Sequence, residues 1–334
     1  MTIIPEWTDV TPRTFRDEVL PSARPAVFRG LTAEWPLVRA GRASDIALCD
    51  YIKRFDRGAA APTMVGPPTI NGRFFYNDDL SGFNFQPGTA RIGAALDFLM
   101  ERAADERPVA FAIQSAPVRS ALPGLEAENR MPLLNDEVDP RIWIGNKVIV
   151  AAHHDNFENI ACVAAGRRTF TLFPPDQVAN LYTGPFELTP AGAIISMVSF
   201  DEPDLDRFPK FSTAMAAAMT ADLGPGDAIY IPYLWWHHVR SLDRLNILVN
   251  YWWTPTAEAR GAPRDAFLHA MLAVRSLPKA HRDAWRALFE HFVFQDDGPA
   301  GEHLPPERRG VLGEMDVQTL KALRASLART LSRS

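Results

Sequence analysis

Hydrophobic and polar positions divide the chain into three regions with different periodicities. In the first hundred residues, short apolar runs alternate with turn residues. Pro and Gly bracket an apolar run at 25–30, which predicts a strand, and the spacing over 92–103 predicts a helix. The Ala-, Pro- and Gly-rich segment 58–68 predicts a loop.

The middle of the chain has a different pattern, with short runs rich in β-branched and aromatic residues separated by Gly, Pro and Asp. These runs lie at 143–145, 148–150, 169–173, 228–231 and 246–252. Many short strands of this kind predict a mainly β fold, either a barrel or a two-sheet jelly roll with flanking helices.

After residue 254 the apolar residues follow a helical spacing. We therefore predict two parts, a β domain over residues 1–256 and a helical appendage over residues 257–334. The appendage is interpreted either as capping helices or as a dimer interface. The second interpretation predicts a homodimer, because four large apolar residues fall within eight positions of one short helix: Trp285, Leu288, Phe289 and Phe292.

Composition narrows the possible partners and compartment. The formal net charge of -5 gives no electrostatic reason for binding a polyanion, so the charge argues against nucleic acid as a partner. Cys49 and Cys162 lie far apart without CxxC spacing, which predicts neither a disulfide framework nor a thiolate zinc site. No signal peptide and no apolar run of about 18 residues is evident, so we expect a cytoplasmic protein that does not enter the membrane.

Two histidine-bearing segments offer metal ligands. His153 and Asp155 are two residues apart at the end of a predicted strand, so they face the same side. His237 follows a second apolar run and supplies a third ligand. Two histidines and one carboxylate leave the opposite coordination positions free, as in non-haem Fe(II) oxygenases. Each segment alone is weak, because a buried histidine is more often a hydrogen-bonded core residue than a ligand.

The residues around these histidines make the pattern more specific. The segment 153–159, HHDNFEN, is followed by GRRTFTLFPP at 166–175, by GDAIYIP at 226–232 and by WWHHV at 235–239. This order resembles the JmjC-type cupin-like family of Fe(II)- and 2-oxoglutarate-dependent oxygenases, which includes asparaginyl hydroxylases. The resemblance covers roughly residues 20 to 255.

The resemblance implies a double-stranded β-helix in which His153, Asp155 and His237 hold Fe(II), with 2-oxoglutarate and O₂ as co-substrates. His154 and His238 are the competing histidines. Asn159 and Asn250 match family positions that contact 2-oxoglutarate. Either asparagine is alternatively explained as a turn cap or a bridge between strands.

Three departures concern the co-substrate pocket. Arg168 stands where the family has a lysine for the distal carboxylate; the alternative is that Arg167 and Arg168 form a solvated pair on an exposed strand edge. Val150 replaces a frequent threonine, and the family tyrosine expected near residues 111–114 is missing. Tyr76 is a speculative replacement donor.

The resulting functional prediction is a 2-oxoglutarate-dependent dioxygenase that hydroxylates a peptide or protein side chain. A small molecule or a modified nucleoside is an alternative substrate, because one fold serves many chemistries. A metal-binding cupin without oxygenase activity, such as an isomerase or a binding protein, is a second hypothesis, and a catalytically silent scaffold is a third.

Overall fold

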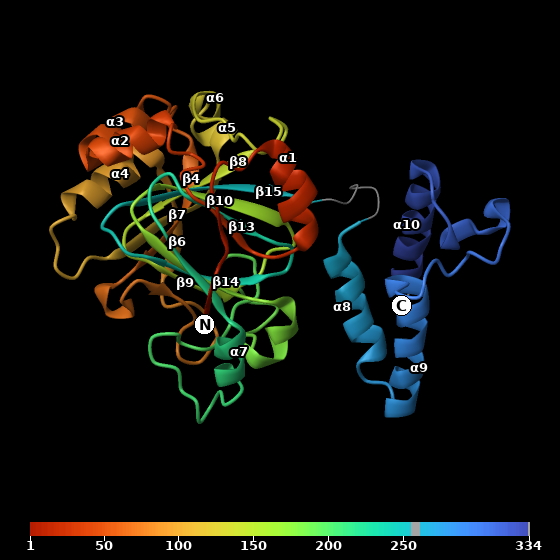
Figure 1. The fold of residues 1–334 in the computed structure, drawn as a ribbon. Helices are drawn as coiled ribbons and strands as arrows, with labels where there is room; N and C mark the ends of the chain where they lie inside the picture. The colour runs from red at the N-terminus through yellow and green to blue at the C-terminus, as the bar shows by residue number, and fades with distance from the viewer. Residues whose placement is uncertain (255–260, 333–334) are drawn as a thin grey trace. The chain divides into compact units, whose positions relative to one another are not determined.

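In the computed structural model, which describes residues 1–254 and 261–332, the chain forms two compact units, Met1–Trp253 and Thr254–Ser334 (Figure 1). The boundary predicted between residues 256 and 257 lies outside the described residues. Each unit is therefore considered by itself.

Two sheets make up the first unit, and their strands come from distant parts of the chain. The six-stranded sheet has the order β1 (Thr2–Ile3), β12 (Met219–Leu223), β11 (Arg168–Phe173), β14 (Trp236–Ser241), β9 (Ile149–His153) and β5 (Arg73–Phe74). The nine-stranded sheet has the order β2 (Glu6–Trp7), β3 (Ala26–Phe28), β13 (Ala228–Ile231), β10 (Glu158–Ala165), β15 (Asn246–Trp253), β8 (Pro140–Gly145), β7 (Ala110–Pro117), β4 (Ala60–Gly66) and β6 (Gln86–Arg91).

Strands β8 to β15 cross repeatedly between the two sheets, with only β11 and β12 consecutive in one sheet, which gives the predicted double-stranded β-helix. Strands β12, β11, β14 and β9 are neighbours in one sheet, and β13, β10, β15 and β8 are neighbours in the other. Their inner faces meet in one apolar cluster that includes Phe170, Leu172, Val239 and Leu248. The jelly-roll prediction is confirmed.

Strand β10 explains how the nine-stranded sheet becomes buried on both faces. Ala161 and Val163 belong to the inner cluster, whereas Ile160 and Cys162 belong to a larger cluster on the outer face. Helices α2 (Pro36–Ala43), α3 (Asp45–Lys53) and α4 (Ile92–Glu101) supply the partners on that outer face. The sequence of a strand that is buried on both faces is a continuous apolar run and does not alternate between apolar and polar residues.

The turn from β10 to β11 requires glycine. Gly166 has φ +71°, a region that other residues rarely adopt, and an added Cβ would lie 2.3 Å from Oδ1 of Asn246. The backbone at Gly166 therefore sets which residues of β11 face the interior. Arg168 has the same strand parity as Phe170 and Leu172, so its side chain enters the barrel.

Most predicted elements are present, and one prediction is wrong. Residues 26–28 form β3, and the helix expected over 92–103 is α4. The segment 58–68, which we expected to be a loop, contains β4, paired with β6 on one side and β7 on the other. Pairing on both edges outweighs the poor strand propensity of its Ala, Pro and Gly residues.

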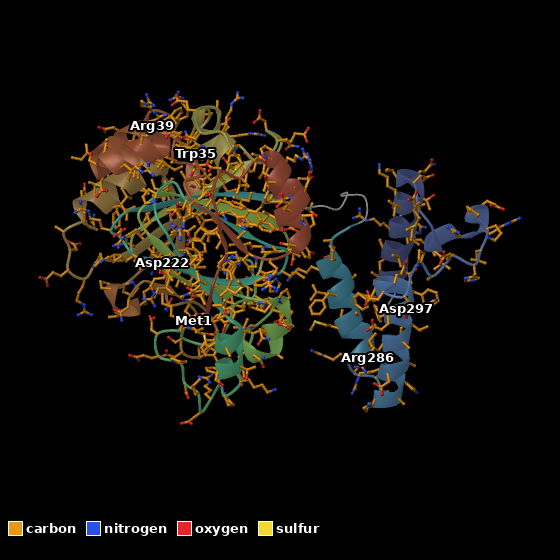
Figure 2. The ribbon with its side chains drawn as sticks, viewed as in Figure 1. Met1, Trp35, Arg39, Asp222, Arg286 and Asp297 are labelled. Atoms are coloured by element: carbon orange, nitrogen blue, oxygen red, sulfur yellow. The ribbon has the colours of Figure 1, made fainter. Side chains whose placement is uncertain are left out.

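The remaining helices of the first unit are short: α1 (Pro12–Thr14), α5 (Val118–Ala121), α6 (Leu125–Glu128) and α7 (Phe211–Ala217). At α2, Figure 2 shows Trp35 directed inward and Arg39 at the surface. Trp35 is buried and donates its indole N–H to the carbonyl of Arg130, which connects the start of α2 to the segment that follows α6.

The second unit is helical, as predicted, with α8 (Pro263–Val274), α9 (Lys279–Phe289) and α10 (Val317–Leu331). Trp285, Leu288 and Phe292 are each about 44–45% exposed. Among the described residues, no helix combines the length and apolarity needed to cross a bilayer.

Candidate metal and co-substrate site

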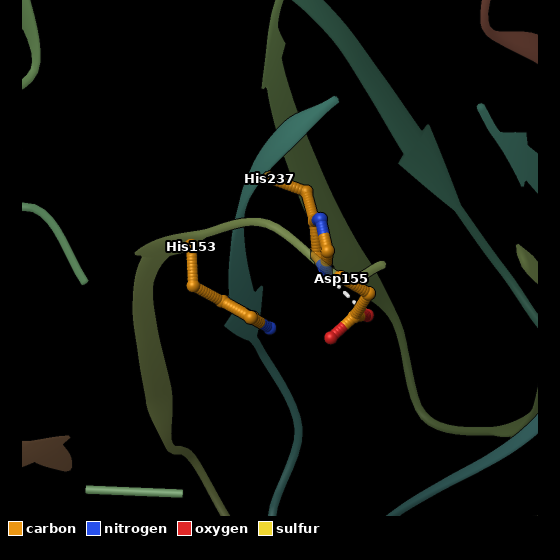
Figure 3. A group of neighbouring side chains, drawn as sticks. All are labelled: His153, Asp155 and His237. Carbon is orange, nitrogen blue, oxygen red and sulfur yellow. Dashed lines mark ion pairs between the residues drawn. The ribbon is translucent and has the colours of Figure 1, made fainter. Parts of the chain in front are cut away.

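Three potential metal ligands come together at one end of the barrel (Figure 3). His153 is the last residue of β9 and is the register partner of His237 on β14. Asp155 follows two residues later, and its carboxylate Oδ2 lies 3.6 Å from Nε2 of His237. One ligand atom from each residue lies within 4.8 Å of the others, which is compatible with a shared ion.

Hydrogen bonds orient both histidines for metal binding. Nδ1 of His153 lies 2.9 Å from the carbonyl oxygen of Ala151, and Nδ1 of His237 lies 3.2 Å from that of Trp235. A protonated Nδ1 donates to the carbonyl, which leaves the Nε2 lone pair for a metal. The backbone therefore selects the tautomer that a ligand requires.

The neighbouring histidines face away from this group. His154 packs edge-on against Trp236 at 4.7 Å, on the opposite side of its strand from His153. His238 stacks on Phe200 at 4.2 Å. The structure thus brings together the three residues expected from the sequence and separates the two competing histidines from them.

Burial determines the charge state of the group. It lowers the pKa of His237 well below its usual value, so the ring is neutral at neutral pH. Burial also raises the pKa of Asp155, and the nearby His153 opposes that rise. Oδ2 of Asp155 is buried without a hydrogen-bond partner, so a cation would satisfy an atom that the protein leaves unpaired. The donor set and this unpaired oxygen fit Fe(II).

A cavity opens beside the ligands, with an empty volume of about 600 Å³ including its open mouth. His153 and Asp155 line it together with apolar walls and a few polar groups. The other lining residues are Met64, Phe74, Gln114, Trp143, Ile149, Val150, Ala151, Pro190, Ala191, Ala193, Ile195 and Trp252. A concave, mainly apolar site with a few polar groups is typical of a small-molecule pocket.

Arg168 is buried, so the alternative of a solvated arginine pair is wrong for this residue. Arg167 is exposed and paired with Asp243, whereas Arg168 is only 5% exposed. Its Nε has no hydrogen-bond partner among the described residues, and burial lowers its pKa to about 10. Arg168 is not among the residues that line the cavity.

The two asparagines lie side by side on β10 and β15. Nδ2 of Asn250 donates to Oδ1 of Asn159 at 2.8 Å, and Oδ1 of Asn250 is buried without a partner. Rotating both amides by 180° would keep the hydrogen bond and present an amide donor instead. The pair therefore bridges strands and also leaves one unsatisfied polar atom inside the barrel.

Tyr76 does not supply the missing hydroxyl. Its Oη donates to the carbonyl of Leu188 at 2.8 Å, and the ring packs against Ala151 and Ile195, which line the cavity. The speculation that Tyr76 is a co-substrate donor is therefore wrong in this arrangement, because its donor is already used.

Trp143 and Trp252 also line the cavity, although neither was predicted as a site residue. Both indole N–H groups are buried without partners among the described residues, and the rings meet at 6.0 Å. Strand alternation was the available signal, since Trp252 has the parity of Asn250. In the described part of the chain, the buried side-chain atoms that lack a partner are Trp143 Nε1, His154 Nδ1, Asp155 Oδ2, Arg168 Nε, Ser241 Oγ, Asn246 Oδ1, Asn250 Oδ1 and Trp252 Nε1.

Comparison with known proteins agrees with this geometry. A family model described as a cupin-like domain matches residues 12–259. The chain is 26% identical to the HSPB1-associated protein 1 homolog of Danio rerio, with 82% of this chain and 62% of the relative aligned. It is 24% identical to lysine-specific demethylase 8 of Xenopus tropicalis, with 76% and 53% aligned. It thus spans a little over half the length of these two relatives.

A human relative is matched over more of its length. The chain is 28% identical to the bifunctional peptidase and (3S)-lysyl hydroxylase JMJD7, with 72% of this chain and 79% of that protein aligned. The family match, the alternating sheets and the grouped His, Asp and His side chains agree with one another. This chain belongs to the JmjC-type cupin-like family.

Proposed function

We propose that this protein is an Fe(II)- and 2-oxoglutarate-dependent dioxygenase that hydroxylates a side chain of a peptide or protein. The observation that carries the proposal is the ligand group of His153, Asp155 and His237, which borders a cavity and retains an unpaired carboxylate oxygen. Iron held there would supply the oxidising chemistry, in which 2-oxoglutarate, O₂ and a C–H bond give succinate, CO₂ and an alcohol.

The protein's own groups would bind and orient the reactants. Arg168 would hold the distal carboxylate of the keto acid, because a guanidinium binds a carboxylate through two parallel hydrogen bonds. The amides of Asn159 and Asn250 would contact the keto acid from the opposite sheet. The apolar walls, including Val150 and Ile195, would exclude water from the reacting centre.

Support for a protein substrate comes from two relatives and from the cavity. The relatives' names specify lysyl hydroxylation and lysine demethylation, both of which act on a protein side chain. Phe157 is 41% exposed and stacks on the cavity residue Trp252, with ring centroids 6.0 Å apart. Gln114 also lines the cavity and offers both an amide donor and an acceptor. We propose that these side chains contact the substrate.

The test is anaerobic reconstitution with Fe(II), followed by measuring succinate formation from 2-oxoglutarate with and without a peptide library. Wild type should form succinate and His153→Ala should not. His154→Ala is the matched control, because His154 is adjacent but faces away from the metal group. Equal activity in wild type and His153→Ala would refute the oxygenase proposal. Metal binding without succinate formation would favour a non-oxygenase cupin.

We also propose that the second unit mediates a homodimer. The apolar side chains of Trp285 and Leu288 on α9, and of Phe292 just after it, are each more than two-fifths exposed. Apolar groups spaced at three and four residues form one face of a helix, which suits packing against a second copy.

A further inference from the structure

The pocket for the distal carboxylate lacks the hydroxyl groups that such a ligand would ordinarily meet. Val150 lines the cavity with an apolar side chain, and residues 111–114 contain no hydroxyl. A buried carboxylate needs several donors, since an ionised group leaves water only when its acceptor sites are satisfied. Arg168 alone would have to provide them all.

Trp143 offers an additional donor on the opposite sheet from Val150. Its ring lines the same cavity and packs on the inner apolar cluster, as Val150 does. The indole Nε1 is buried without a partner, and an indole nitrogen is only a donor. A buried donor without a partner destabilises the protein, so an acceptor at this position is favoured.

The strand register places the backbone of Trp143 towards the end of β10 that leads into β11 and Arg168. Trp143 pairs with Leu248, which in turn pairs with Val163 near the end of β10. The chain then turns at Gly166 and enters β11 at Arg168. Trp252 lies four residues from Leu248 along β15, about 13 Å along the backbone at 3.3 Å per residue. The Trp143 ring extends in that direction, because its centroid lies 6.0 Å from that of Trp252.

We propose that the Trp143 indole N–H donates to the distal carboxylate of the 2-oxo acid, beside Arg168, in place of the missing hydroxyl groups. The proposal rests on the proposed oxygenase function and names a further binding residue of its co-substrate. An indole N–H and a guanidinium offer donors and no acceptor. This part of the pocket therefore selects an ionised carboxylate, which is an acceptor only.

The experiment uses the full chain loaded with Zn(II), which is diamagnetic and does not turn over. Calorimetry would compare 2-oxoglutarate with pyruvate, which has the same keto acid end but no distal carboxylate. Trp143→Phe keeps the ring and removes the N–H. We expect it to weaken 2-oxoglutarate binding on the order of tenfold and to leave pyruvate binding unchanged.

Trp253→Phe is the matched control. Trp253 follows Trp252 on β15 and contacts Phe15 at 6.1 Å on the outer face of the sheet, so its loss should not change either affinity. In ¹⁵N-correlated spectra, the indole resonance that Trp143→Phe removes should move when 2-oxoglutarate is added to wild type, and should not move with pyruvate.

Equal 2-oxoglutarate affinities for wild type and Trp143→Phe would overturn the inference while leaving the oxygenase proposal intact. The inference would also be overturned if Trp143→Phe lost the same affinity for both keto acids, because that result indicates a general structural change. If Trp143→Phe does not fold, the spectra of the wild-type protein still test the contact. The chain has eight tryptophans, and the contact is refuted if none of their indole resonances moves when 2-oxoglutarate is added. A wild type that does not bind 2-oxoglutarate overturns both proposals.

Discussion

Replacing Arg168 by methionine should make the protein more stable and less able to bind its co-substrate. Burial lowers the pKa of Arg168 from 12.5 to about 10. At about 1.4 kcal/mol for each pKa unit, the folded chain loses about 3 kcal/mol by keeping this charge buried. Because the folded-state pKa lies below the unfolded one, the loss is complete at pH 7 and is relieved only as the pH rises through about 10.

Methionine has a similar length and no charge, so Arg168→Met should raise the free energy of unfolding of the metal-free protein by up to about 3 kcal/mol. The same change removes the cation from the carboxylate site. A bidentate, charge-assisted contact contributes about 3–4 kcal/mol, so affinity for 2-oxoglutarate should fall by about 10²- to 10³-fold.

Two assays separate these effects. Urea denaturation of the metal-free protein measures stability, and calorimetry of the Zn(II)-loaded protein measures affinity. Arg168→Lys is the control, because it keeps a charge and donors and should retain binding within about tenfold. If Arg168→Met lowers stability and binds 2-oxoglutarate as wild type does, the guanidinium is a structural element and the reasoning fails.

Three further predictions concern the metal, the pH dependence and the second unit. Fe(II) or Zn(II) should raise the midpoint of thermal unfolding of wild type and of His154→Ala, because a metal stabilises the folded state that binds it. The midpoint of His153→Ala should not rise. A rise in all three proteins would contradict the assigned ligands. Burial, aided by Arg73, lowers the pKa of His238 to about 3. The unfolded chain therefore protonates this residue below about pH 6.5 while the folded chain does not, so the metal-free protein should lose about 2 kcal/mol of stability between pH 6.5 and pH 5. Denaturation of His238→Gln should show a smaller loss. The same pH dependence in both proteins would contradict the prediction. Light scattering should give the mass of a dimer for wild type and a lower mass for Trp285→Glu, and a monomeric wild type at micromolar concentration would refute the interface.

The pattern of short strands predicted a barrel or a jelly roll, and the order of motifs implied the double-stranded β-helix through its resemblance to the family. Strand alternation also separated His153 from His154. It could not recognise β4, whose composition is that of a loop and whose strand conformation depends on pairing with β6 and β7, which are distant in sequence. Tertiary pairing of that kind leaves no local signal.

The environment of Arg168 was equally hidden from the sequence. Arg167 and Arg168 are consecutive, and periodicity requires only that they face opposite sides. Which of them is buried follows from the turn at Gly166 and from the inner cluster that receives β11. The position of Trp143 beside the cavity likewise depends on how the strands pack together. The sequence therefore predicted Trp143 as part of a strand and not as a residue of the site.

The unpaired interior groups connect stability with function. Trp143, Arg168 and Asn250 each bury a polar atom without a partner, and each such atom costs about 1–3 kcal/mol or more. An apolar interior would be more stable, so we interpret these groups as partners for a ligand that would satisfy several of them together. Two of them, Trp143 and Arg168, are donors, whereas the unpaired oxygen of Asp155 lies at the metal group. A ligand with a carboxylate at one end and metal-binding oxygens at the other would fit both groups. The same residues should therefore lower the stability of the ligand-free protein and raise the stability of the ligand-bound protein.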